Sequence, residues 1–70
     1  MKKRSVKISG HATSVSLEEP FWDALKKLSE EEKTSLNALI DKIDKARAGG
    51  NLSSALRLYV LGDLQKKLLA

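Results

Sequence analysis

The 70-residue chain contains no cysteine and only one histidine, His11. The lack of cysteine excludes disulfide cross-links, thiolate zinc sites and thiol nucleophiles, and one histidine is too few for a histidine-based metal cluster. The chain also lacks a glycine-rich phosphate loop, and its acidic residues form no obvious catalytic pair. We therefore expect neither an enzyme nor a protein that depends on a metal or cofactor.

Long hydrophobic runs are missing as well. No stretch approaches the ~20 apolar residues that span a bilayer. The residues after Lys2-Lys3-Arg4, namely Val6-Lys7-Ile8-Ser9-Gly10, are not the apolar segment of a signal peptide. The expected location is the cytoplasm, without a membrane partner.

The small size of the chain limits the core that it can build. A domain of this length buries only ~60% of the surface that its unfolded chain exposes. Since the chain can form no disulfide cross-links, association with another chain is the remaining way to stabilise the fold. We therefore expect an oligomer.

The formal net charge of +4 is unevenly distributed along the chain. Residues 1–17 carry four basic residues and no acid, for a charge of +4. Residues 18–32 have six acids and two lysines (−4), and residues 33–70 have seven basic residues and three acids (+4). A basic N-terminal segment favours a polyanionic partner such as nucleic acid, or it is a solvated tail.

The first 17 residues show strand-like alternation. Apolar and hydroxyl side chains alternate through Thr13–Leu17, with Val15 and Leu17 on one face and Ser14 and Ser16 on the other. Residues 5–9 alternate too, but with the apolar residues at even positions. This change of parity predicts a turn or bulge at Gly10-His11.

Three amphipathic helices are predicted after the strand. Pro20 begins the first, Thr34-Ser35 precedes the second, and Asn51 or Ser53 caps the third. Gly49-Gly50 ends the second helix. The apolar stripes are Phe21, Trp22, Ala24, Leu25 and Leu28 in the first helix, Leu36, Leu39, Ile40 and Ile43 in the second, and Leu52, Ala55, Leu56, Tyr59, Val60 and Leu64 in the third. Further leucines widen the third stripe over more than half of the helix, so we expect a partner subunit to cover it.

A strand at residues 12–17 needs a hydrogen-bonding partner, and two arrangements are open. Residues 4–9 could fold back on it as an intrachain hairpin. Alternatively, the strands of two identical chains could pair antiparallel across a two-fold axis, which would also bury more surface.

The order of strand, helix, short polar turn and second helix resembles the ribbon-helix-helix family of Arc/MetJ-type repressors. The resemblance rests on Thr13–Leu17, Phe21–Leu25, Leu28 and Thr34–Ile40, and is closest to short bacterial ribbon-helix-helix proteins. It implies a mainly α fold with one short strand, an intertwined homodimer joined by a two-stranded antiparallel intersubunit sheet, and an extra C-terminal helix. The expected parts are a basic arm (1–10), a ribbon-helix-helix core (11–48) and the C-terminal helix (51–69) of the same domain, with association beyond a dimer through that helix left open.

The resemblance also implies double-stranded DNA as the partner, read by a ribbon in the major groove. It places Ala12, Ser14 and Ser16 at the base-facing positions. The expected phosphate contacts are the cap Ser35, the backbone of Leu36 and Asn37, and the basic side chains of Lys2, Lys3, Arg4 and Lys7. The chain departs from many relatives by having Ala12 where they carry a basic or amide side chain.

These expectations describe a sequence-specific, homodimeric DNA-binding protein, a small transcriptional regulator. The alternative is a protein-interaction or assembly module, or an antitoxin-like protein, without strong DNA binding of its own. If residues 4–9 paired beside a dimeric ribbon, the sheet would widen to four strands and fit the groove badly, which would count against the family's mode of binding.

Overall fold

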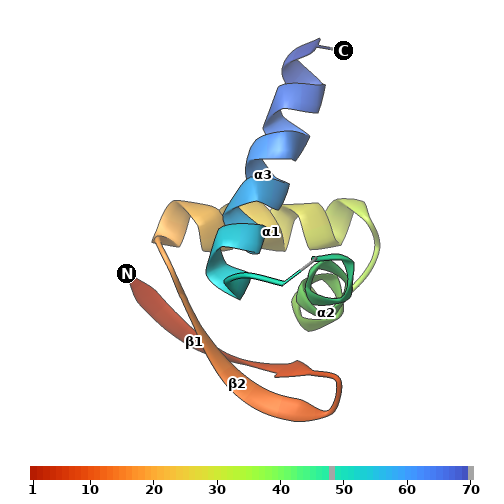
Figure 1. Cartoon of the computed structure of the whole chain (residues 1–70). Helices are drawn as coiled ribbons and strands as arrows, with labels where there is room; N and C mark the ends of the chain where they lie inside the picture. The colour runs from red at the N-terminus through yellow and green to blue at the C-terminus, as the bar shows by residue number, and fades with distance from the viewer. Residues whose placement is uncertain (48, 70) are drawn as a thin grey trace.

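The computed structural model of the chain describes residues 1–47 and 49–69. Two strands precede three helices (Figure 1). The elements are β1 (Lys2–Ile8), β2 (His11–Leu17), α1 (Glu19–Glu31), α2 (Leu36–Ala46) and α3 (Leu52–Leu69).

The two strands form an antiparallel hairpin within the chain. Lys2 lies opposite Leu17, Ser5 opposite Ser14, and Ile8 opposite His11. The connecting residues Ser9 and Gly10 both have positive φ, +51° and +83°. Positive φ at both central residues is typical of a type I′ turn, whose twist matches that of the flanking strands. The turn therefore lies one residue earlier than Gly10-His11.

Of the two pairings that the sequence left open, the structure shows the intrachain hairpin. Residues 2–8, for which a basic arm was expected and an additional strand was left open, form a strand. Val6 explains why: its side chain is only 7% exposed and belongs to the core, which a solvated arm would not allow. The intertwined dimer stays a prediction.

The predicted helices are confirmed, with their capping residues. Pro20 lies in the first turn of α1, and Lys33, with φ of +56°, follows its end. The Ser35 hydroxyl caps α2 by accepting a hydrogen bond from the Ala38 N–H at 3.0 Å. Asn51 does the same for α3, accepting from the Ser54 N–H at 3.2 Å. Residue 48, the last residue of the expected core span, lies outside the described residues.

One hydrophobic core joins the hairpin to all three helices. Its fully covered side chains are Leu17, Leu25, Leu39, Ile40 and Leu56. The core also contains Trp22, which is 3% exposed, as expected for a packing residue. The predicted stripes of α1 and α2 thus face inward, whereas α3 buries only Leu56 and Val60.

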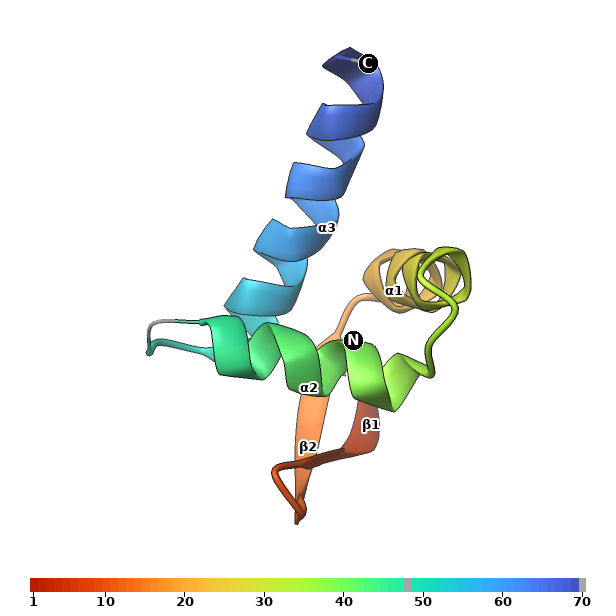
Figure 2. The ribbon, with the colours of Figure 1, turned by 90° about the vertical axis from the view of Figure 1, so that its right-hand side faces the viewer.

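The elements are arranged in layers. The hairpin lies below α2 and the start of α3, α1 packs against both of these helices, and the rest of α3 extends away from the hairpin (Figures 1 and 2). β1 contacts α2, and β2 contacts the start of α3. One face of the hairpin is thereby left facing away from the helices.

Candidate nucleic-acid interface

The hairpin has two chemically different faces, because side chains alternate along each strand. The inner face carries the buried Val6, Val15 and Leu17. The outer face carries the residues of the opposite parity, which are Lys3, Ser5, Lys7, Ala12, Ser14 and Ser16.

The outer face is basic and hydroxyl-rich. The register places Lys3 opposite Ser16, Ser5 opposite Ser14, and Lys7 opposite Ala12. All six residues are exposed except Ser16, which is half-buried. The face thus has two positive charges, three hydroxyls and one methyl group, and no carboxylate among its side chains.

The residues expected to face DNA bases lie together. Ala12, Ser14 and Ser16 share the outer face of β2, opposite in direction to the core residues Val15 and Leu17. Their contact with DNA stays a prediction, whereas their position on one solvent-facing surface is an observed property of the hairpin.

The four basic residues expected to bind phosphate are divided between the two faces. Lys3 and Lys7 lie on the outer face. Lys2 and Arg4 are at even positions, as Val6 is, and therefore lie on the inner face. The guanidinium of Arg4 lies over the indole of Trp22, with Cζ 5.5 Å from the ring centroid. Arg4 therefore forms a cation–π contact at the edge of the core.

Two side chains of α2 anchor the outer edge of β1. The Asn37 amide accepts a hydrogen bond from the Lys7 N–H at 2.7 Å and donates one to the Lys7 carbonyl at 2.9 Å. The Asp41 carboxylate accepts from the Ser9 N–H at 3.1 Å. The hydrogen bonds from Lys45 and from Ser9 hold the pKa of Asp41 below its usual value. The turn end of the hairpin is thus fixed to α2.

The other end of the hairpin is anchored as well. The indole N–H of Trp22 donates to the Lys2 carbonyl at 2.8 Å, and the Ser53 hydroxyl donates to the Ser16 carbonyl at 3.2 Å. α1 and α3 therefore hold the open end of the hairpin while α2 holds its turn.

The N-terminus of α2 lies beside the outer edge of β1. Ser35 is exposed and caps the helix, and Asn37 is tied to Lys7, so the predicted phosphate-binding residues of α2 adjoin one of the basic residues of β1. Sequence reasoning missed the side-chain role of Asn37, which joins residues 30 positions apart. The phosphate contacts of Ser35, Leu36 and Asn37 stay predictions.

Three carboxylates of the acidic segment, residues 18–32, form ion pairs with side chains of α3 and α2. Glu18 accepts from Arg57 at 2.9 Å, Glu31 pairs with Lys67 at 3.0 Å, and Glu32 pairs with Lys42 at 2.9 Å. The hydrogen bond from Arg57 lowers the pKa of Glu18. The acidic segment thus has a structural role in docking α3, which sequence reasoning did not identify.

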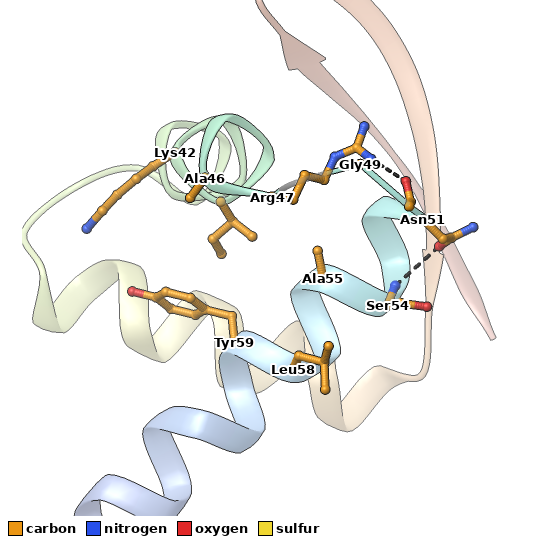
Figure 3. A pocket seen from close by; sticks show the side chains of 11 residues that line it. Lys42, Ala46, Arg47, Gly49, Asn51, Ser54, Ala55, Leu58 and Tyr59 are labelled. Carbon is orange, nitrogen blue, oxygen red and sulfur yellow. Dashed lines mark hydrogen bonds between the residues drawn. The ribbon is translucent and has the colours of Figure 1, made fainter.

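A second surface feature lies between α2 and α3. A groove of about 590 Å³ is lined by Ile43, Ala46, Ala55, Leu58 and Tyr59, among others (Figure 3). Beyond it, α3 exposes Leu61, Leu64, Leu68 and Leu69. The covering subunit that the sequence predicted for these leucines stays a prediction.

Two further findings concern residues 1–47 and 49–69. The residues in these two ranges contain no group of three or more His, Cys, Asp or Glu residues that could hold a metal ion. None of the helices described is long and apolar enough to cross a membrane.

Comparison with known proteins identifies the family. No curated protein and no solved structure matches the chain. The family model described as "Ribbon-helix-helix domain" matches residues 1–64, which include both strands, α1, α2 and most of α3. Members of this family are in general dimeric DNA-binding domains without enzymatic activity, which supports a DNA-binding, regulatory kind of function. The chain belongs to the ribbon-helix-helix domain family.

Proposed function

We propose that this protein is a small transcriptional regulator that binds double-stranded DNA through the outer face of the β1–β2 hairpin. The main support is the composition of that face: Lys3 and Lys7 beside Ser5, Ser14 and Ser16, with no carboxylate. A basic, hydrogen-bonding surface on a two-stranded ribbon matches the electrostatics and the dimensions of the major groove.

In this proposal the side chains of the face contact base edges. A serine hydroxyl bonds to many base edges and discriminates weakly, and the methyl group of Ala12 can contact a thymine methyl. Stronger discrimination must come from elsewhere, so β2 alone supports only modest sequence preference. The first turn of α2 and the basic residues outside the ribbon would add phosphate contacts.

The proposed working form is a homodimer, as the family suggests. The outer edge of β2 is open at Ala12 and Ser14, whose backbone groups point away from β1 by the alternation of antiparallel pairs. The exposed leucines of α3 offer a second surface for another copy of the chain. The alternative function, an interaction or assembly module without strong DNA binding, is favoured by those leucines.

Titration of a fluorescent duplex at two salt concentrations tests the proposal. Binding should weaken as salt rises, by ~0.9 log unit of affinity per log unit of salt for each neutralised phosphate. The double variant Lys3→Ala/Lys7→Ala should bind roughly tenfold or more weakly. Lys26→Ala/Lys27→Ala removes the same charge from exposed positions on α1 and should change the affinity far less. Absence of duplex binding at low salt would refute the proposal and leave the interaction module.

A further inference from the structure

We infer that α3 packs antiparallel against α3 of a second copy of the chain, with the two helices crossing at Gly62. The pairing places two hairpins at opposite ends of one assembly, so that it can join two DNA segments. It uses no residue of the hairpin and is therefore compatible with a dimer formed through the strands. The joining of DNA rests on the proposed function, whereas the pairing of the helices does not.

The outward side of α3 has the spacing of a helix-pairing surface. Leu58, Leu61 and Leu68 are 66%, 48% and 84% exposed. Together with Gln65 they form an exposed stripe, with steps of three, four and three residues from Leu58 to Leu68. These steps are the a and d spacing at which one helix packs along another. None of the four side chains is charged, so the stripe suits an apolar helix as its partner.

Gly62 has no structural reason within the single chain. It is exposed in the interior of α3, and a Cβ added there would meet no atom within 4 Å. Glycine in the middle of a helix is less favourable than alanine, because it loses more conformational freedom on folding. Gly62 lies one turn after Leu58 and next to Leu61. A missing side chain at this point allows the backbone of a second helix to approach closely.

The two halves of α3 are complementary to each other, which favours a second copy as the partner. The N-terminal half borders the groove of about 590 Å³, which Ala55 and Leu58 help to line (Figure 3). The C-terminal half projects from the body of the protein and carries Leu68 and Leu69, which are 84% and 88% exposed (Figure 1). Antiparallel packing lays the projecting leucines of each copy over the groove of the other, so the same contact forms twice.

The stripe also sets the register of the pair. In antiparallel helices that pack through a and d residues, each a residue faces a d residue of the other helix. Leu58 of one copy then packs on Leu68 of the second copy. In the same register Leu61 packs on Gln65 of the second copy. The two-fold axis passes close to Gly62, so the glycines of the two copies lie where the backbones come nearest.

Electrostatics favour the antiparallel direction over the parallel one. Lys66 and Lys67 lie in the last turn of α3, so a parallel pair would bring the lysines of both copies side by side. The antiparallel pair keeps them at opposite ends and also aligns the helix dipoles favourably. A parallel pair would further place the two grooves opposite each other and leave both unfilled.

The exposed leucines supply the affinity. Removing one leucine side chain from water strengthens an association by roughly tenfold or more. The pair covers Leu58, Leu61, Leu68 and Leu69 of each copy, which are all exposed in the single chain. Burial of eight such side chains offsets the loss of freedom on association.

The pairing determines where the hairpins lie. The start of α3 is held on β2, where the Ser53 hydroxyl donates to the Ser16 carbonyl at 3.2 Å, and the end of α3 points away from the hairpin (Figure 1). Two antiparallel α3 helices therefore hold their hairpins at opposite ends of a helix pair. Its length is about 27 Å, for 18 residues at about 1.5 Å each. The two outer faces point away from each other, so one assembly can bind two duplexes.

Gly62→Gln tests the crossing point. Glutamine forms helix better than glycine, and its Cβ meets no atom of the single chain within 4 Å, so the Tm of the dilute protein should rise. In the pair, two added side chains meet at the crossing, so self-association measured by sedimentation equilibrium should weaken by roughly tenfold or more. Lys66→Gln adds the same side chain outside the contact and should keep the affinity. Unchanged or tighter association of Gly62→Gln would overturn the inference.

Single cysteines test the direction of the pair, because the natural chain has none. Measured along the helix axis, Leu64 lies about 3 Å from Leu64 of the second copy, whereas the two Leu68 residues lie about 15 Å apart. With a short bismaleimide cross-linker, Leu64→Cys should give covalent dimers and Leu68→Cys should not. A parallel pair would bring the two Leu68 residues together and reverse this result. The reversed result, or no cross-linking of either variant, would refute the antiparallel pair.

Retention of one duplex by another tests the joining of DNA. One duplex is fixed to beads, and a second, fluorescent duplex is added together with the protein. The natural protein should retain the second duplex, whereas Gly62→Gln should still bind the bead-bound duplex and retain several-fold less of the second. Equal retention by both proteins would show that α3 does not join the hairpins. Absence of duplex binding at low salt would refute the proposed function and the joining of DNA, while the cross-links would still decide the pairing of the helices.

Discussion

The side-chain amide of Asn37 pairs with both backbone groups of Lys7, at 2.7 Å and 2.9 Å. Because these two groups lie on the edge of β1 that faces away from β2, the pair closes this edge to another strand at that point. Asn37 thus positions the hairpin and occupies the edge of β1 at Lys7, which leaves the outer edge of β2 as the one more open to another strand.

Replacing Asn37 with alanine should lower the free energy of unfolding by about 1–2 kcal/mol, since each net hydrogen bond contributes about 0.5–1.5 kcal/mol. For a domain of this size, 1 kcal/mol corresponds to roughly 4–8 °C in Tm. Thermal unfolding followed by circular dichroism measures the change. Asn37→Asp keeps the acceptor for the Lys7 N–H but places a carboxylate oxygen against the Lys7 carbonyl, so its Tm should also lie below that of the natural protein. An unchanged Tm for Asn37→Ala would contradict the anchoring role.

The hydrogen bond between Tyr59 and Glu32 predicts an alkaline transition. Tyr59 donates its hydroxyl to Glu32 Oε2 at 2.7 Å, and this bond, together with burial, raises the pKa of Tyr59 to about 12. A raised pKa means that the folded state keeps the proton more tightly than the unfolded state, whose tyrosine titrates near 10. The stabilisation is therefore complete below about pH 10 and is lost as pH rises towards about 12.

Tyr59 is the only tyrosine, so tyrosinate absorbance reports on it alone. Its midpoint should lie near pH 12 in the folded protein and near 10 in denaturant. Tyr59→Phe removes this titration, and the stability difference between the two proteins should shrink as pH rises through this range. A folded-state midpoint near 10 would show that the bond to Glu32 does not persist in solution.

Much of the fold follows from local sequence patterns. The stripes of α1 and α2, the caps Ser35 and Asn51, and the direction of Ser14 and Ser16 relative to Val15 all follow from spacing within one element. These features depend on helix and strand periodicity, which the sequence displays directly.

The pairing of β1 and the division of the basic residues could not be read from charge. The relevant signal was the even-numbered parity that Arg4 shares with Val6, which places its side chain on the Trp22 side of the hairpin. The bonds of Asn37 to Lys7 and of Trp22 to Lys2 join residues 30 and 20 positions apart. Such contacts depend on how the elements pack, and no local pattern encodes them.

The exposed leucines of α3 predict self-association. A helix that is apolar around most of its surface is normally covered, yet Leu61 and Leu64 are 48% and 51% exposed in the single chain. Leu61→Lys/Leu64→Lys should convert a dimer or larger assembly to a monomer, as measured by sedimentation velocity. Lys66→Ala, which alters charge on the same helix but keeps the leucines and the Glu31–Lys67 ion pair, should leave the assembly state unchanged. A natural protein that is monomeric at high concentration would show that these leucines do not join copies.

The turn of the hairpin allows its backbone preference to be tested alone. Gly10 has φ of +83°, and a Cβ added there would meet no atom within 4 Å, so Gly10→Ala changes conformational preference without a clash. An L-residue with a side chain at positive φ costs about 1–2 kcal/mol, so the free energy of unfolding of Gly10→Ala should fall by about that amount.

Ser9 also has positive φ, and asparagine accepts this region more readily than serine. Ser9→Asn should therefore raise the stability by a few tenths of a kcal/mol while keeping the N–H that Asp41 binds. Urea unfolding of the two variants should shift the midpoint in opposite directions, and a shift in the same direction would argue against a type I′ turn.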